Sequence, residues 1–425
     1  MLISTYKMEI IKNYLKYSLW LVLIVFAALF GLHWLPAITI DGHTMRRVDL
    51  LSDLRYPKQE VVVADSDTIP LPPVVKPVFV DTCRAGMTCI EDYGDSTRRG
   101  MASFYEALDR TSSSHPDHDG LVRIAVFGDS FIEADIFTAD LREMLQKRFG
   151  GCGVGFVTIT SMTSGYRPTV RHTFGGWSSH AVTDSVYFDK KKQGISGHYF
   201  IPREGAYVEL RGQSKYASLL DTCQQASIFF YNKDSVHLTA RVNRGESKNY
   251  SLAPSGDLQK ISVEGRIGSV RWTVDRADST LFYGLAMDGK KGIILDNFSL
   301  RGSSGLSLRG IPQQMLRQFN EQRPYDLIIL EYGLNVATER GRNYDNYQKG
   351  LLTSIEHLKN CFPQASILLL SVGDRDYKTE DGELRTMPGA KNLGDCTALV
   401  QMIQKHFDKG GYVAAICAAP IVLDR

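Results

Sequence analysis

Residues 122–149 read VRIAVFGDSFIEADIFTADLREMLQKRF, and this stretch decides the fold class. The run VRIAVFG at its start is apolar and partly β-branched, which predicts a short buried strand. After a polar turn, Thr138 is the expected N-cap of a helix that stops at Gly150 and Gly151. That helix is expected to turn one apolar face inward, formed by Leu141, Met144, Leu145 and Phe149. The order of strand, loop and helix indicates an α/β protein.

The same order returns in the second half of the chain. YDLIILEY at 325–332 and ASILLLS at 365–371 are expected to be buried strands, and 344–358 carries apolar residues at helical spacing. Alternating strands and helices favour a parallel sheet with helices on both faces. Between the two halves, residues 173–300 carry short strand-like runs broken by Gly, Asn, Asp and Ser. This composition predicts an all-β, sandwich-like insert.

The tripeptide Gly128-Asp129-Ser130 lies directly after the first strand and ahead of the helix. A serine there is expected at the C-terminal edge of a parallel sheet, where open α/β folds build their sites. Backbone N–H groups of the next turn are then free to bind an oxyanion. The position suits a nucleophile, and the alternative is an ordinary strand-to-helix turn.

Three segments in order resemble the conserved blocks of the SGNH/GDSL hydrolase family. GDSFIEADIFTADLREML resembles the first block, and Ser304-Gly305 in RGSSGLSL is similar to the second. Gly333-Leu334-Asn335 in EYGLNVA looks like the third block, at the end of a buried strand. The alternatives are a loop glycine at Gly305 and a turn-capping asparagine at Asn335.

The resemblance implies a serine ester hydrolase without metal or cofactor. Ser130 is the implied nucleophile, and its own N–H, the Gly305 N–H and the Asn335 side-chain amide are the implied oxyanion donors. A β insert between the first two blocks resembles the arrangement in the peptidoglycan O-acetylesterases of this superfamily. An acylated glycan or peptidoglycan is therefore the expected substrate.

The general base that this family supplies is missing from the expected place. The family carries Asp-x-x-His near the C-terminus, but neither His357 nor His406, the histidines after Asn335, has an aspartate three residues before it. Asp234 and His237 have the right spacing but fall inside the β insert, where residues three apart on a strand point to opposite faces. Without its base, the chain is expected to be weakly active or inactive.

A catalytically silent glycan-binding envelope protein is the alternative function. Several aromatic residues of the insert are candidates for stacking on sugar rings, although packing in the core is the simpler role. These residues are Trp177, Tyr187, Trp272 and Tyr283.

The tail, residues 387–425, resembles a fragment of the ThiJ/PfpI family. Its AAICAAP segment resembles the turn that presents the reactive cysteine of that family, here Cys417. One helix at about 392–407 and one strand at 412–417 are expected, in the places of the hydrolase's own last helix and strand. We hypothesise that the chain joins two unrelated genes near Met387.

The N-terminal segment is expected to anchor the protein. Residues 18–36 are almost wholly apolar, and a membrane-spanning helix needs about 20 such residues. Because Lys7, Lys12 and Lys16 precede this run, the N-terminus is expected in the cytoplasm and the rest of the chain outside, in the periplasm or at the cell surface. A cleaved signal peptide and a buried core helix are the alternatives.

Composition excludes some functions. The 425 residues include 49 Lys and Arg against 47 Asp and Glu, with no basic run, so nucleic acid is not an expected partner. The seven cysteines lack metal-ligand spacing, and Cys83 and Cys89 form either a disulfide or two free thiols. The expected parts are a cytoplasmic N-terminus (1–17), a transmembrane anchor (18–40), a proline-containing stalk (41–95), two hydrolase segments (96–172 and 301–386), the β insert (173–300) and the tail (387–425).

Overall fold

The computed structural model divides the chain into two units, Met1–Val80 and Asp81–Arg425. The described residues are 16–25, 39–40, 43–44, 90–92, 100–111, 120–184, 188–337, 343–372, 375–378, 384–387 and 414–416. Within the first unit, residues 16–25 are helical, and β1 (Thr39–Ile40) pairs with β2 (His43–Thr44). Among the described residues, no helix has both the length and the apolar character needed to cross a membrane. Most of the expected stalk, including Cys83 and Cys89, lies outside the described residues.

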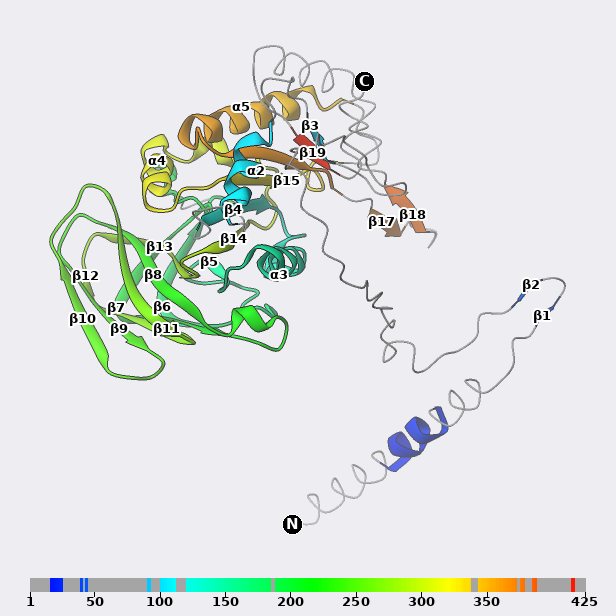
Figure 1. Cartoon of the computed structure of the whole chain (residues 1–425), viewed down its shortest axis with the longest axis horizontal. Helices are drawn as coiled ribbons and strands as arrows, with labels where there is room; N and C mark the ends of the chain where they lie inside the picture. The colour runs from blue at the N-terminus through cyan, green and yellow to red at the C-terminus, as the bar shows by residue number, and fades with distance from the viewer. Residues whose placement is uncertain are drawn as a thin grey trace, which may run out of the picture. The chain divides into compact units, whose positions relative to one another are not determined.

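The second unit is built on a six-stranded sheet in the order β14-β4-β15-β16-β19-β3 (Figure 1). All neighbours pair in parallel except β19 and β3. The strands are β3 (Glu91–Asp92), β4 (Leu121–Gly128), β14 (Gly292–Ser299), β15 (Leu327–Glu331), β16 (Ser366–Leu370) and β19 (Ala414–Ile416). The expected parallel sheet is therefore present, and the two strands expected at 325–332 and 365–371 are its β15 and β16.

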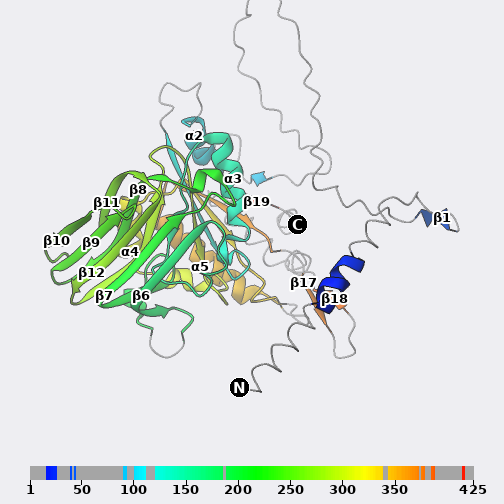
Figure 2. The same ribbon diagram turned by 90° about the horizontal axis from the view of Figure 1, so that it is seen from below.

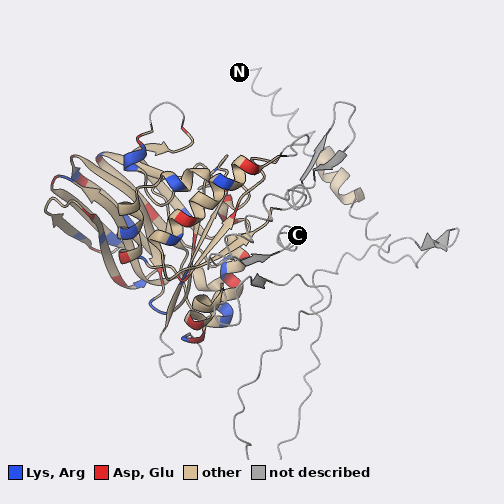
Figure 3. Cartoon of the chain, turned by 90° about the horizontal axis from the view of Figure 1, so that it is seen from above, with Lys and Arg blue, Asp and Glu red and all other residues tan. Residues whose placement is uncertain are grey.

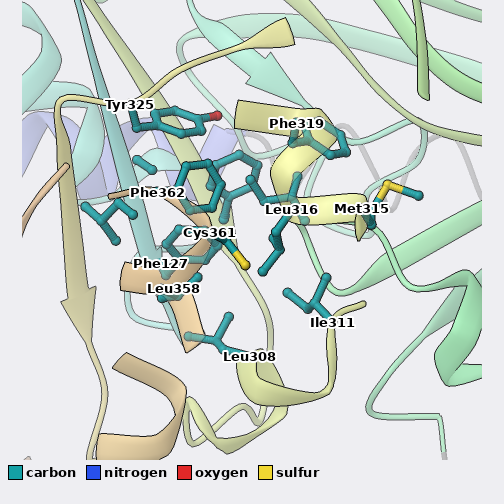
Figure 4. Close-up of a cluster of buried hydrophobic side chains, with 14 of the residues drawn as sticks. Phe127, Leu308, Ile311, Met315, Leu316, Phe319, Tyr325, Leu358, Cys361 and Phe362 are labelled. Carbon is teal, nitrogen blue, oxygen red and sulfur yellow. The ribbon is translucent and has the colours of Figure 1, made fainter. Parts of the chain in front are cut away.

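Helices cover both faces of this sheet, and alternate residues of β4 show which helices lie on which face. Ile124 and Val126 share a core with α2 (Ala102–Asp109) and α3 (Thr138–Phe149). Ala125 and Phe127 share a second core with α4 (Gln313–Gln322) and α5 (Asp345–Cys361), as Figure 4 shows. A strand that is buried on both faces is apolar at successive positions, as VRIAVFG is.

Helix α3 has the expected bounds, and Leu141, Leu145 and Phe149 of its expected apolar face are partly buried against the sheet core. Its most buried residues are Thr138, Ala139, Arg142 and Gln146, while Met144 is 62% exposed. Thr138 is also not the N-cap, because Phe137 holds that position and the Thr138 hydroxyl donates to Asp135. The prediction was wrong for Met144, because Arg142 and Gln146 take the fully buried positions and bond backbone carbonyls of β14.

The insert is a nine-stranded antiparallel sheet that splits into two halves (Figure 2). One half is β10-β9-β12-β7, with β6 beside β7, and the other is β13-β8-β11, with β5 beside β13. Among the described residues, the halves are joined where Phe282 pairs with Phe200, and their apolar faces share one core. This matches the expected sandwich-like form. The strands are β5 (Gly155–Val157), β6 (Val170–Ala181), β7 (His198–Gly212), β8 (Cys223–Asn232), β9 (Val236–Val242), β10 (Ser247–Leu252), β11 (Leu258–Ile267), β12 (Ser269–Ala277) and β13 (Thr280–Asp288).

Both expected boundaries of the insert, 173 and 300, were wrong. Strand β5 precedes residue 173 but pairs with β13, so the insert begins earlier. Strand β14 precedes residue 300 but pairs with β4 in the parallel sheet, so the insert ends earlier. The run GIILDNFS is almost continuously buried, which is typical of a central parallel strand and not of an alternating sandwich strand.

A buried guanidinium fixes the insert to the hydrolase part. Arg323, just after α4, donates at 2.5 Å to Asp288 at the end of β13 and at 2.5 Å to Asp296 of β14. Burial raises the pKa of Asp296, but the Arg323 charge outweighs it and lowers that pKa overall. Because all three side chains are almost fully buried, this ion triad ties one insert strand to the parallel sheet.

Candidate active site

Ser130 follows β4 at the C-terminal edge of the parallel sheet, as the sequence predicts, and is half-buried. The Glu133 amide donates to the Ser130 carbonyl at 3.3 Å and closes a turn around it. A short helix, η2 (Glu133–Asp135), follows, and Ala134 and Asp135 have φ of 58° and 63°. Left-handed backbone is unfavourable for residues other than glycine, so something must hold this loop in place.

The buried carboxylate of Asp135 holds that loop. It accepts hydrogen bonds from Thr138, Thr169, Asn297 and the guanidinium of Arg142. Arg167 forms a second ion pair with it at 2.8 Å. Burial alone would raise the pKa of Asp135, but the charges of Arg142 and Arg167 lower it well below its usual range. Sequence patterns do not reveal this cluster, because its members come from three separate segments, 135–142, 167–169 and β14.

Gly305 is the N-cap of η5 (Leu306–Gly310) and has a φ of 81°. A Cβ atom there would lie 2.7 Å from the ring of Tyr332, so both the backbone angle and the close approach require glycine. Its amide donates to the Ser303 hydroxyl at 3.2 Å. In this structure the expected oxyanion donor is therefore occupied by a neighbouring side chain.

Asn335 brings the three motifs together. It follows β15, and its Nδ2 donates to Asp129 Oδ2 at 3.0 Å and to the Ser303 carbonyl at 2.8 Å. Asp129 is the neighbour of Ser130, and Ser303 lies two residues before Gly305. The residues expected from the sequence therefore meet at one edge of the sheet, but both amide hydrogens of Asn335 are already used.

Glu331, the last residue of β15, is a buried carboxyl beside this site that sequence reasoning missed. It is 6% exposed and pairs in register with Gly128. Its Oε2 has no hydrogen-bond partner within the described ranges. Burial, and then the charge of Asp129, raise the pKa of Glu331 to about 8. The sequence signal that points to Glu331 is an acidic residue at the end of the otherwise apolar strand LIILE.

Among the described residues, no histidine forms a hydrogen bond with Ser130. His237 lies on β9 of the insert and contacts the Ser251 hydroxyl at 2.9 Å, and His357 lies 2.8 Å from the Ile311 carbonyl. Burial lowers the pKa of His172 to about 4, and its ring bonds the Ile159 carbonyl. His406 lies outside the described residues. The described ranges also contain no group of three side chains suited to a metal ion.

The tail contributes β19, which pairs in parallel with β16 from Leu368 and Ala414 onward. The strand expected at 412–417 is thus present beside the hydrolase's own strands, as the sequence analysis proposed. Cys417 and the expected helix at about 392–407 lie outside the described residues.

No family model and no curated protein matches the chain. The likeness of the tail to the ThiJ/PfpI family is therefore unsupported. Solved structures do match by fold. One of a peptidoglycan O-acetylesterase has a TM-score of 0.56 and 18% identity, covering 77% of this chain and 85% of the other.

Two further structures match more weakly. A family two carbohydrate esterase from Clostridium thermocellum in complex with cellohexaose has a TM-score of 0.21 and 10% identity, over 56% of this chain and 85% of the other. A mutant family 29 carbohydrate-binding module has a TM-score of 0.21 and 12% identity, over 32% of this chain and 93% of the other. These two scores are too low to carry an argument. The chain shares the α/β fold of the peptidoglycan O-acetylesterase, and its reaction is argued separately from its own residues.

Proposed function

We propose that the protein is an SGNH-type serine ester hydrolase that acts on acylated glycan, such as O-acetylated peptidoglycan. The observation that carries the proposal is the position of Asn335, whose amide bonds both the neighbour of Ser130 and the loop before Gly305. Three motifs far apart in the sequence thus meet at the sheet edge where open α/β folds place their chemistry. The shared fold with a peptidoglycan O-acetylesterase supports this substrate class.

In the proposed reaction, Ser130 Oγ attacks the ester carbonyl, the bond between the acyl carbon and the sugar oxygen breaks, and the sugar leaves as an alcohol with the proton that the Ser130 hydroxyl gives up. Water then releases the acyl group from Ser130. The oxyanion is stabilised by the Ser130 and Gly305 N–H groups and by Asn335, each worth about 3 kcal/mol. Substrate must first displace the Ser303 hydroxyl from Gly305 and one of the two acceptors from Asn335.

We expect the full chain to hydrolyse p-nitrophenyl acetate slowly and Ser130→Ala to lower that rate to the background that the oxyanion donors and substrate binding sustain. The chain has no Asp-x-x-His after Asn335, and a triad enzyme without its base retains roughly 10³-fold to 10⁴-fold acceleration over water. Added imidazole is expected to raise the Ser130-dependent rate, because it supplies the missing base. The exposed Ser214→Ala is the matched control and should leave the rate unchanged. Equal rates for the wild type and Ser130→Ala would remove Ser130 from the mechanism.

A catalytically silent glycan-binding protein is the second candidate. It is favoured by the lack of an Asp-x-x-His base, and because the N–H donors of Gly305 and Asn335 already bond other groups of the protein. Of the aromatic candidates, Trp272 and Tyr283 are buried in the core, and Trp177 is half-buried with its indole N–H donating to the Tyr207 carbonyl. Tyr187 lies outside the described residues. An absence of Ser130-dependent turnover, with and without imidazole, favours this candidate.

We also propose that residues 18–36 anchor the protein, with the N-terminus in the cytoplasm. The support is the apolar run and the lysines before it. Alkaline phosphatase, which needs an oxidising compartment to fold, is expected to be active when fused after residue 425 and inactive when fused ahead of residue 1 of the full chain. The reverse pattern would contradict the orientation, and recovery of the fusion after residue 425 as a soluble protein shortened at its N-terminus would indicate a cleaved signal peptide.

A further inference from the structure

A cleft lies where the insert meets α4, away from the motifs around Ser130. Its volume is about 570 Å³, a size typical of ligand sites. One wall comes from the turn before β7 and from β8 and β13, and the other comes from the start of α4. Gln318 of α4 joins the two sides, because it bonds Asp257 at 2.5 Å and the Leu258 amide at 3.0 Å. The cleft is thus a built feature of the junction between insert and hydrolase.

The cleft carries an excess of positive charge. Three lysines line it, against one aspartate, Asp189. Lys192 pairs with Asp189 at 3.4 Å, whereas Lys191 and Lys233 have no ion-pair partner among the described residues. Two solvent-facing ammonium groups on one concave wall attract an anion. Over the rest of the unit, by contrast, Figure 3 shows basic and acidic residues interspersed.

The remaining lining has the mixed character of a saccharide site. Tyr231, Ile201 and Leu281 supply apolar and aromatic surface, while Thr280 and Gln314 supply polar groups. A pyranose ring has both apolar faces and hydroxyl edges, which this mixture matches. The cleft is also lined by Tyr283, whose buried hydroxyl has no hydrogen-bond partner within the described part of the chain.

The cleft lies within reach of the candidate active site along the same segment of chain. Pro312 lines the cleft and Gly305 belongs to the expected oxyanion loop, so the two are at most about 25 Å apart by chain length. The 3₁₀ turn η5 between them shortens that distance. A polymeric glycan is long enough to cover that distance.

We propose that this cleft binds a carboxylate-bearing saccharide, with Lys191 and Lys233 contacting the carboxylate. The inference rests on the proposed glycan substrate and narrows it to an anionic glycan. A planar anionic bilayer is the poorer match, because the charged groups line a concave cleft rather than a flat surface.

The test measures binding of two probes to the full chain in neutral detergent by calorimetry. The probes are the peptidoglycan disaccharide of N-acetylglucosamine and N-acetylmuramic acid, which carries one carboxylate, and its uncharged methyl ester. The acid is expected to bind about tenfold more tightly than the ester, and this preference is expected to shrink with salt. The double variant Lys191→Gln/Lys233→Gln is expected to bind the two equally, whereas the exposed Lys215→Gln control keeps the preference.

Equal binding of acid and ester to the wild type would overturn the proposal. A preference for the acid that survives in the double variant would also overturn it. So would competition by sodium acetate that is as effective as competition by the disaccharide acid, because the cleft would then bind a carboxylate without recognising the sugar. Binding to phosphatidylglycerol vesicles that requires Lys191 and Lys233 would assign the lysines to a lipid surface instead. Turnover of p-nitrophenyl acetate separates this idea from the esterase proposal, because that substrate is too small to need the cleft.

Discussion

Asp135→Asn is expected to lower the free energy of unfolding of the full chain by about 4 kcal/mol. The substitution keeps the shape of the side chain but removes the charge that Arg142 and Arg167 face, and Arg142 is completely buried. Removing one partner of a buried ion pair is costly because the other charge stays buried and unpaired. Urea denaturation in neutral detergent, followed by tryptophan fluorescence, measures the loss.

The matched control is Glu143→Gln on α3, the helix that carries Arg142. Glu143 pairs with Lys147 at 2.6 Å on the surface, and such a pair contributes about 0.5 kcal/mol or less. Should Asp135→Asn cost no more than this control, the carboxylate would not be what holds the loop after Ser130. Because the wild-type carboxylate has its pKa lowered, its stabilisation is complete above its ordinary pKa and is lost as the pH falls toward the folded value.

The sequence predicted the parallel sheet and the meeting of the three motifs because both follow from short-range patterns. A continuous apolar run predicts a central strand, and residues after parallel strands gather at one edge. The rule that a continuous apolar run predicts a central strand also applies to the start of GIILDNFS, which is β14. It was grouped with the insert as one of the short strand-like runs broken by Gly, Asn, Asp and Ser.

The buried positions of Arg142 and Gln146 and the Asp135 cluster were not accessible in this way. Arg142 reads as a surface residue in any helical pattern, yet it is buried because Asp135 and the Leu295 carbonyl of β14 accept hydrogen bonds from it. The Asp135 carboxylate also pairs with Arg167. Leu295 and Arg167 come from segments that are distant in the sequence. Buried polar networks of this kind depend on tertiary contacts that periodicity does not encode.

Glu331 gives the clearest pH-dependent expectation. Its folded pKa of about 8 is above its ordinary value of 4.5, because burial and Asp129 disfavour the charged form. The folded state therefore holds a proton that the unfolded state releases between these values. The contribution to stability is complete below pH 4.5 and is lost as the pH rises toward 8. We expect this loss to be about 2 kcal/mol, since local relaxation reduces the full penalty of a buried charge.

Glu331→Gln keeps the shape of the side chain and cannot ionise, so it is expected to remove this fall in stability. Urea denaturation measures the free energy of unfolding at the two pH values. We expect the variant and the wild type to be similar at pH 5, and the variant to be about 2 kcal/mol more stable than the wild type at pH 8. Glu356→Gln, on the exposed side of α5, is the control and should keep the wild-type pH dependence. If Glu331→Gln lost stability between pH 5 and pH 8 as steeply as the wild type, another group would be responsible. If the stability of Glu331→Gln instead stays constant between pH 5 and pH 8, the fall in the wild type comes from Glu331. Its carboxyl is then neutral at neutral pH and places no second negative charge beside Asp129.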